Sequence, residues 1–409
     1  MSFFSSNNPC LCESGLDYLY CCGAPDRREL NIVARIESDE SDAFRQLPVG
    51  ISNSIHNMSF SPDWFPVKID LPANKITFVK MSPFWYEESV FLDAGRILGT
   101  YAIEMQSDFV KEKLHSLEWH YSPIIFHTAF CGSTLLSKAL SQAYNSLPLR
   151  EPDLLGSLFS TIPNEFASDA QYVKWVMGLL TRRYDPDQPV VIKANDYANG
   201  LMCKLLETKS STPTLFMYIP LNEFLAGCLK DGGRQQWIAE RYTFIKNRLA
   251  VIFPELDKLN IGEGEWGKMA AAYWSYNISL YLQAHQMFPD RMRCLDFNQM
   301  LKMPEQVIEA CAHWFGLKPL SGVSLSGEIK SLFNVYSKGG QEYNKDKRRE
   351  DIDNILRENA EHMSMAKTCA IEIIGQFALD PKLPGQLYTP EAKIKKHRGI
   401  VKRFFLGAE

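Results

Sequence analysis

A short turn at residues 131–134 carries residue types that bind phosphate. An apolar run at residues 124–126 precedes it, and a helix-like stretch follows from residue 135. Gly132 lets backbone N–H groups approach a ligand closely, and the hydroxyls of Ser133 and Thr134 can donate to phosphate oxygens. The following helix adds the partial positive charge of its N-terminus. The layout predicts an anion site made of Cys131, Gly132, Ser133, Thr134 and Leu135; an ordinary strand-to-helix turn is the alternative.

The turn itself contains no lysine or arginine, so a bound phosphate needs a cation from elsewhere. Backbone dipoles at exposed sites are worth only about 0.3–1 kcal/mol each. Lys193 is the leading candidate because it ends an apolar run, residues 190–193, that is typical of a buried strand. A surface lysine at a strand end is the alternative. Further candidate cations come later in the chain: Lys230, Arg234, Arg241, Lys338 and the charged run 345–349.

Four cysteines near the N-terminus are spaced as metal ligands. One residue separates Cys10 from Cys12, and the adjacent pair Cys21 and Cys22 follows after a short turn. Four thiolates can surround one Zn²⁺ at about 2.3 Å per Zn–S bond, and a site closed by four protein ligands is structural. The stretch resembles the SEC-C motif, a small zinc module, and this resemblance implies a docking site for a protein partner. Reduced cysteines without a metal are the alternative.

Composition excludes some classes of function. The 409 residues are 22% charged and 45% hydrophobic, and their net charge of −4 provides no global basic field for nucleic acid. No apolar run reaches the about 18 residues of a membrane span. The first ten residues lack the basic-then-apolar order of a signal peptide, so we expect a reducing cytoplasm. The basic tail at 393–405 could contact an acidic partner or a membrane surface, although a solvated tail is the simpler interpretation.

The elements that must position the turn alternate between strands and helices. Apolar strands are predicted at 190–193 and 214–219, and residues 222–290 favour helices. This order predicts an α/β fold with a parallel P-loop-type sheet flanked by helices. Ligands of such sheets bind at the carboxyl ends of the strands. The turn, Glu151 and Lys193 should therefore project from one edge.

The rest of the chain divides into smaller regions. Val67–Leu71 and Lys75–Met81 alternate around a turn and predict a hairpin, part of a β-rich cover. Helices are expected over 93–117 and 346–378. The length is too great for one compact core. We expect four parts: a zinc module at 1–25, a mixed β/α region at 26–120, the α/β domain at 121–345, and a C-terminal helix with the basic tail at 346–409.

Residues 122–345 resemble the sulfotransferase family, with gaps. The stretch 130–136 is similar to the loop with which that family wraps the 5′-phosphate of PAPS, the adenylyl donor of sulfuryl groups. Lys193 stands where the family has a lysine after its second strand. Asp296, Pro304 and the triplet 315–317 fit the family's late strand, acidic turn and helix. The resemblance implies PAPS as the donor.

Three departures weaken the donor assignment. Phe130 stands where the family usually carries arginine or lysine. The family's 3′-phosphate clamp, an Arg with a Ser eight residues later, corresponds to Pro220 and Cys228, and neither is a strong phosphate ligand. The family's C-terminal glycine loop is only echoed by residues 336–345. Lys230, Arg234 and Arg241 could replace the missing clamp, and Lys338 with the charged run 345–349 could close over it.

The resemblance also implies catalytic roles. Glu151 corresponds to the base of some sulfotransferases, with a structural acid beside Pro152 as the alternative. Asn195 and Asp196 are weaker candidates for binding the acceptor, and His127 reads as a core residue.

Three functions stay open from the sequence. The first is PAPS-dependent sulfuryl transfer to a hydroxyl or amine of a small molecule, a peptide or a carrier-bound substrate. The second is a non-catalytic interaction module on a degenerate nucleotide-binding fold. The third is a kinase-like transferase, although no Walker lysine is present to support ordinary ATP use.

Overall fold

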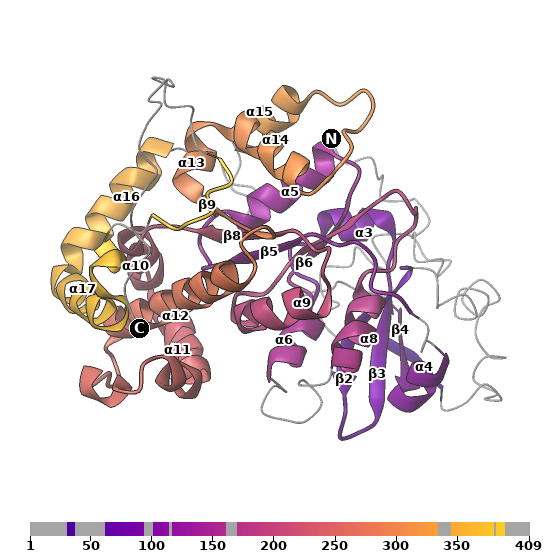
Figure 1. Cartoon of the computed structure of the whole chain (residues 1–409), viewed down its shortest axis with the longest axis horizontal. Helices are drawn as coiled ribbons and strands as arrows, with labels where there is room; N and C mark the ends of the chain where they lie inside the picture. The colour runs from indigo at the N-terminus through magenta and orange to yellow at the C-terminus, as the bar shows by residue number, and fades with distance from the viewer. Residues whose placement is uncertain are drawn as a thin grey trace, which may run out of the picture.

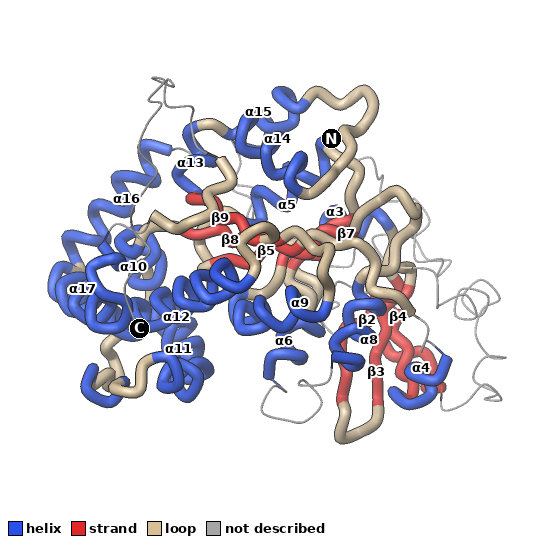
Figure 2. Tube along the Cα trace, viewed as in Figure 1, coloured by secondary structure: helices blue, strands red, loops and turns tan. Residues whose placement is uncertain are grey.

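The computed structural model describes residues 31–36, 62–93, 101–113, 117–160, 170–333, 345–379 and 382–388. In this part of the chain, two sheets lie among helices (Figure 1, Figure 2). Cys10, Cys12, Cys21, Cys22 and Lys338 lie outside the described residues, so the zinc module and the role of Lys338 stay predictions.

The larger sheet has five parallel strands in the order β6-β7-β5-β8-β9. Its strands are β5 (Ile124–His127), β6 (Leu147–Arg150), β7 (Val190–Lys193), β8 (Thr214–Tyr218) and β9 (Met292–Asp296). The chain enters at the central strand β5, runs to the edge strand β6 and returns through β7 before crossing to β8. All five carboxyl ends therefore meet at one edge, and the predicted α/β class with a parallel sheet flanked by helices is confirmed.

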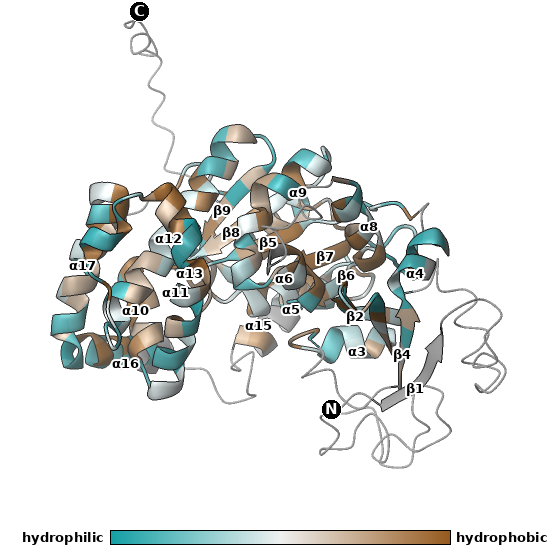
Figure 3. Ribbon diagram, turned by 90° about the horizontal axis from the view of Figure 1, so that it is seen from below, coloured by the Kyte–Doolittle hydropathy of each residue, from teal (hydrophilic) through white to brown (hydrophobic). Residues whose placement is uncertain are grey.

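Helices cover both faces of this sheet. Helices α5 (Ser133–Ala143), α14 (Pro304–Trp314) and α15 (Leu325–Phe333) lie on one side, and α9 (Met202–Thr208) and α12 (Trp266–Met287) lie on the other (Figure 1). The strands between these layers are almost wholly buried, and the central strands β5 and β7 are mostly in the brown of hydrophobic residues in Figure 3. Burial on both faces explains why β5, β7 and β8 are largely continuous apolar runs rather than alternating ones.

The smaller sheet has four strands in the order β1-β4-β3-β2. They are β1 (Asn31–Ile36), β2 (Trp64–Asp70), β3 (Lys75–Lys80) and β4 (Tyr101–Gln106). Strands β2 and β3 pair antiparallel, so the predicted hairpin is confirmed. The prediction of a helix over 93–117 was wrong for residues 101–106, because β3 offers an edge with which this segment pairs. Of the residues that the structure describes in this range, Ser107–Lys113 form a helix, α4.

The remaining helices form the flanks and the C-terminal part. They are α3 (Pro83–Glu88), α6 (Asp153–Ser160), α8 (Ala170–Leu180), η2 (Asp196–Leu201), α10 (Leu221–Leu229), α11 (Gly232–Ile252), η3 (Leu256–Leu259), α13 (Phe297–Lys302), α16 (Lys345–Glu358), α17 (Ala360–Ile374) and η4 (Gly375–Leu379). The helix expected over 346–378 is thus two helices that meet at Asn359. Among the helices of the described segments, none is both long and apolar enough to cross a bilayer.

Candidate anion-binding and catalytic site

The phosphate-type turn is a backbone loop, residues 128–132, between β5 and α5. Three of its residues have left-handed backbone, with φ of 65° at Ala129, 53° at Phe130 and 70° at Gly132. Such angles are uncommon for residues other than glycine and persist only where the surroundings hold them. The N–H groups of the first turn of α5, from Ser133 on, have no acceptor within the helix and are the donors that an anion would use.

A close contact with Phe297, in addition to the left-handed backbone, requires glycine at position 132. A Cβ atom built on it would lie 2.2 Å from the ring of Phe297, the first residue of α13. Any side chain at this position would therefore have to displace Phe297 as well as adopt the left-handed backbone. The ring covers one side of the loop and brings the end of β9 against it.

The Cys131 side chain faces the protein interior. It is fully buried, its Sγ contacts the carbonyl oxygen of Met217 at 3.4 Å, and burial raises the pKa of the thiol to about 11. Only the backbone of Cys131 is placed to contribute to an anion site. Ser133 and Thr134 are also largely buried, so their hydroxyls are available only to a ligand seated in the loop itself.

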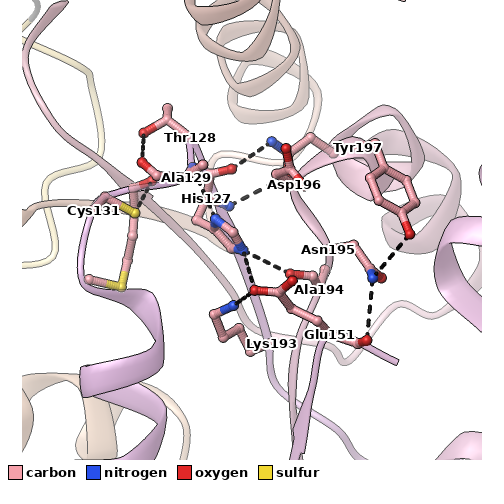
Figure 4. Close-up of polar contacts among 12 residues, drawn as sticks. His127, Thr128, Ala129, Cys131, Glu151, Lys193, Ala194, Asn195, Asp196 and Tyr197 are labelled. Atoms are coloured by element: carbon pink, nitrogen blue, oxygen red, sulfur yellow. Dashed lines mark hydrogen bonds and ion pairs between the residues drawn. The ribbon is translucent and has the colours of Figure 1, made fainter. Parts of the chain in front are cut away.

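Glu151 and Lys193 lie together at the carboxyl edge (Figure 4). Glu151 follows β6 and Lys193 ends the neighbouring strand β7, and the two side chains form an ion pair between Glu151 Oε1 and Lys193 Nζ. Lys193 is fully buried, whereas 17% of the Glu151 side chain is exposed. A buried lysine needs such a partner, because an uncompensated charge in the interior is strongly unfavourable. The leading candidate cation and the candidate base are thus one unit.

The backbone at Glu151 is also unusual. Its φ of 53° is left-handed, and its N–H donates to the carbonyl oxygen of Lys193 at 2.7 Å. The turn directs the Glu151 side chain back across the end of β7.

His127 is the third member of this group. It ends β5, and its Nε2 lies 4.0 Å from Glu151 Oε1 and 2.9 Å from the carbonyl oxygen of Ala194. Its Nδ1 accepts a hydrogen bond from the N–H of Ala129 at 3.0 Å. The expectation of a buried residue holds, since the side chain is 4% exposed. Its contacts with both the loop and the ion pair had no signal in the sequence.

Asn195 lies beside Glu151. Its Nδ2 donates to the carbonyl oxygen of Glu151 at 3.3 Å and contacts Tyr197 Oη at 3.3 Å, and that hydroxyl in turn reaches Asp153 Oδ1 at 3.3 Å. The buried Oδ1 of Asn195 meets no donor within the described part of the chain. It is therefore an open acceptor next to the candidate base.

Asp196 is engaged elsewhere. Its carboxylate accepts from Arg241 at 2.9 and 3.3 Å and from Tyr273 Oη at 2.7 Å. Burial raises the pKa of Tyr273. Asp196 thus holds Arg241, a candidate phosphate ligand, in an ion pair at the start of η2.

The other candidate cations occupy different surroundings. Arg234 lies over the ring of Phe130, with 4.6 Å between the guanidinium carbon and the ring centroid, and donates to the carbonyl oxygen of Gly227 at 3.1 Å. Lys230 is exposed at the end of α10. Arg234 is thus adjacent to the loop through its contact with Phe130.

The two clamp positions offer no phosphate ligand. Pro220 precedes α10, and Cys228 is buried within it, where burial raises the pKa of its thiol.

Among the described residues, no three His, Cys, Asp or Glu side chains gather as metal ligands would. A cavity of about 200 Å³ lies between the β2–β3 turn and helices α6 and α8, with Asp70, Leu154 and Tyr172 among its lining residues. None of the loop residues lines it.

Comparisons with known proteins give the following. No family model matches the chain, and no curated protein matches it. Among solved structures, a sulfotransferase from Alicyclobacillus acidocaldarius is 15% identical, with a TM-score of 0.31, covering 61% of this chain and 96% of that one.

Two more solved structures are similar at the same level. A sulfotransferase domain from the curacin biosynthetic pathway is 13% identical, with a TM-score of 0.31, covering 61% of this chain and 90% of that one. The sulfotransferase STF9 from Mycobacterium avium is 13% identical, with a TM-score of 0.38, and the match covers 78% of this chain and 92% of that one. Likenesses this weak carry no conclusion about activity.

Proposed function

We propose that this protein is a sulfotransferase-like enzyme that transfers a sulfuryl group from PAPS to a hydroxyl or amine acceptor. The observation that carries the proposal is the ion pair of Glu151 and Lys193 at the strand edge that also bears the loop. A base and a cation side by side are what the reaction needs, because it must neutralise charge on the donor and remove a proton from the acceptor.

The loop would bind the 5′-phosphosulfate through the N–H groups at the start of α5. Lys193 would then move its charge from Glu151 to the bridging oxygen of the donor. This exchange would leave Glu151 free to act as a base. The acceptor oxygen attacks sulfur and loses its proton to Glu151, while the sulfur–oxygen bond to the 5′-phosphate breaks and the nucleotide bisphosphate leaves with the electron pair.

The acceptor would need two polar contacts in this arrangement. Its reacting O–H or N–H would donate to Glu151, and a second donor would satisfy the open Oδ1 of Asn195. A buried oxygen that receives no hydrogen bond costs about 1–3 kcal/mol of stability. A substrate that donates a hydrogen bond to Asn195 Oδ1 would therefore be favoured.

Calorimetric titration with 3′-phosphoadenosine 5′-phosphate, alongside ATP, tests the donor assignment. We expect micromolar binding of the bisphosphate that Lys193→Ala weakens by at least about tenfold, one lost charge-assisted contact. Lys174→Ala is the matched control, because Lys174 is exposed on α8, and it should bind as the wild type does. Near-wild-type affinity in Lys193→Ala would remove the role of Lys193.

A non-catalytic interaction protein is the second candidate function. It is favoured by Pro220 and by the buried Cys228, which leave the clamp positions without a phosphate ligand. The absence of heat with either nucleotide would support it, whereas binding of ATP alone would support a kinase-like transferase.

The zinc module belongs to the proposal as an independent part. Cys10, Cys12, Cys21 and Cys22 supply four thiolates, a donor set that suits tetrahedral Zn²⁺ and leaves no open position for catalysis. Elemental analysis of the purified protein should find one zinc per chain, lost on replacing Cys21 and Cys22 by serine. A zinc-free wild-type protein would contradict this assignment. The reducing, cytoplasmic location likewise stays a prediction.

A further inference from the structure

We propose that His127 is a positioning residue that holds the anion-binding loop in shape through its unprotonated Nδ1. The N–H of Ala129 donates to this nitrogen at 3.0 Å, and Ala129 is the first residue of the loop with left-handed backbone, φ 65°. The inference rests on the proposed function in that the loop is taken to bind the phosphate of the donor.

The contacts fix which nitrogen of His127 carries the proton. A backbone N–H can only donate, so Nδ1 must present its lone pair to Ala129. In the neutral ring the proton then sits on Nε2, which lies 2.9 Å from the carbonyl oxygen of Ala194 and donates to it. The ring therefore ties the start of the loop to the residue that follows Lys193.

The backbone of His127 is held as firmly as its ring. Its N–H donates to Asn199 Oδ1 at 3.4 Å, and its carbonyl oxygen accepts from Asn199 Nδ2 at 2.9 Å. Asn199 is itself held by Asn277, whose Oδ1 accepts from Asn199 Nδ2 at 2.6 Å. With backbone and ring both fixed, the direction of Nδ1 sets where the N–H of Ala129 can lie.

This arrangement separates His127 from the chemical step. The Nε2 proton is directed to Ala194 and Nδ1 is occupied by the loop, so neither nitrogen is open to take a proton from an acceptor. Glu151, which follows β6, and Lys193, which ends β7, are charged groups that face this region. A protonated ring would set a second N–H against that of Ala129 and break the contact that shapes the loop.

Two substitutions divide the functions of the two ring nitrogens. In His127→Asn, the amide oxygen takes the place of Nδ1 and can still accept from Ala129. In His127→Gln, the amide group reaches the place of Nε2 and can still contact Ala194, but the N–H of Ala129 loses its acceptor. We expect the asparagine variant to bind 3′-phosphoadenosine 5′-phosphate within about threefold of the wild type, and the glutamine variant to bind about tenfold more weakly or worse.

A readout without nucleotide separates this inference from the proposed function. Nitrogen-15 spectra of histidine- and alanine-labelled protein report which nitrogen of His127 is protonated and where the amide signal of Ala129 lies. We expect the ring of the wild type to be protonated on Nε2. The amide signal of Ala129 should keep its position in His127→Asn and move in His127→Gln. That pattern in a protein that binds no nucleotide would support the role of His127 while the donor assignment fails. A ring protonated on Nδ1 would overturn the inference, and so would equal affinity of the two variants for a nucleotide that the wild type binds.

Discussion

At the scale of single residues, the candidate site depends on a carboxylate and an ammonium group that share one contact. Glu151 is partly exposed while Lys193 is fully buried, so a ligand reaches the carboxylate first. Under the proposed function, the carboxylate would have two partners in turn: the lysine before the donor binds, and the acceptor proton afterwards.

Glu151→Gln separates these two roles. The amide keeps the size of the side chain but cannot take a proton, so transfer to any acceptor should fall by about 10²-fold or more. Binding of 3′-phosphoadenosine 5′-phosphate should persist, since the loop and Lys193 are unchanged. Turnover is measured with PAPS labelled in the sulfuryl group and a panel of acceptors. Unaltered turnover in this variant would exclude Glu151 as the base.

At the scale of elements, the loop is connected to the distant helix α16. Arg348 of α16 forms an ion pair with Glu223 of α10 at 2.8 Å, and its guanidinium carbon lies 5.2 Å from the ring centroid of Phe297. Glu223 also accepts from Asn298 at 2.5 Å. Because Phe297 covers Gly132, these contacts link α16 to the loop through the start of α13.

Arg348→Ala should release α16 from this attachment. The helix is strongly charged and has few apolar residues of its own, so its amides should exchange with deuterium several-fold faster in the variant. Arg349→Ala is the control, because Arg349 is the next residue of the same helix and its side chain is exposed. Equal exchange rates in the two variants would show that the ion pair does not hold the helix.

Part of this site follows from local sequence, and part does not. The strand–turn–helix around Gly132 is predictable because an apolar run, small residues and a helix-like stretch are adjacent in the chain. The placement of Glu151 near Lys193 is predictable because parallel strands share an edge. The role of His127 is not, since it depends on ring orientation and on Ala194 and Asn199 far along the chain. Strand β4 was missed because its partner strand, not its own composition, decides its conformation.

At the scale of the whole molecule, Arg150 connects two regions. One is helix α3 and its C-terminal cap, which follow strand β3 of the smaller sheet, and the other is helix α5 beside the larger sheet. It is fully buried at the end of β6, where burial lowers the pKa of its guanidinium to about 10. It donates to the carbonyl oxygens of Tyr86, Glu87 and Ser89 at 3.2, 2.6 and 3.0 Å. It also donates to the hydroxyls of Ser137 and Ser141 on α5 at 3.2 and 3.0 Å. One side chain thus satisfies acceptors from both regions.

Arg150→Met should lower the free energy of unfolding by about 3–5 kcal/mol, because it leaves several buried acceptors without a donor. Urea denaturation followed by fluorescence and circular dichroism measures the change. The wild type should unfold in one transition by both probes. Arg349→Met, at an exposed position, should change stability by no more than about 0.5 kcal/mol. Two separate transitions in the wild type would show that the regions unfold independently.

Under the proposed function, the left-handed backbone of Ala129 and Phe130 also has a consequence for repeated turnover. A glycine-rich loop samples many shapes when empty and must lose that freedom each time a ligand enters. Residues with side chains sample fewer shapes, so this loop reaches its curved form when the chain folds. Its ordering entropy would then be lost once in the lifetime of the molecule rather than once per catalytic cycle, which would make the empty loop preorganised for the proposed anion.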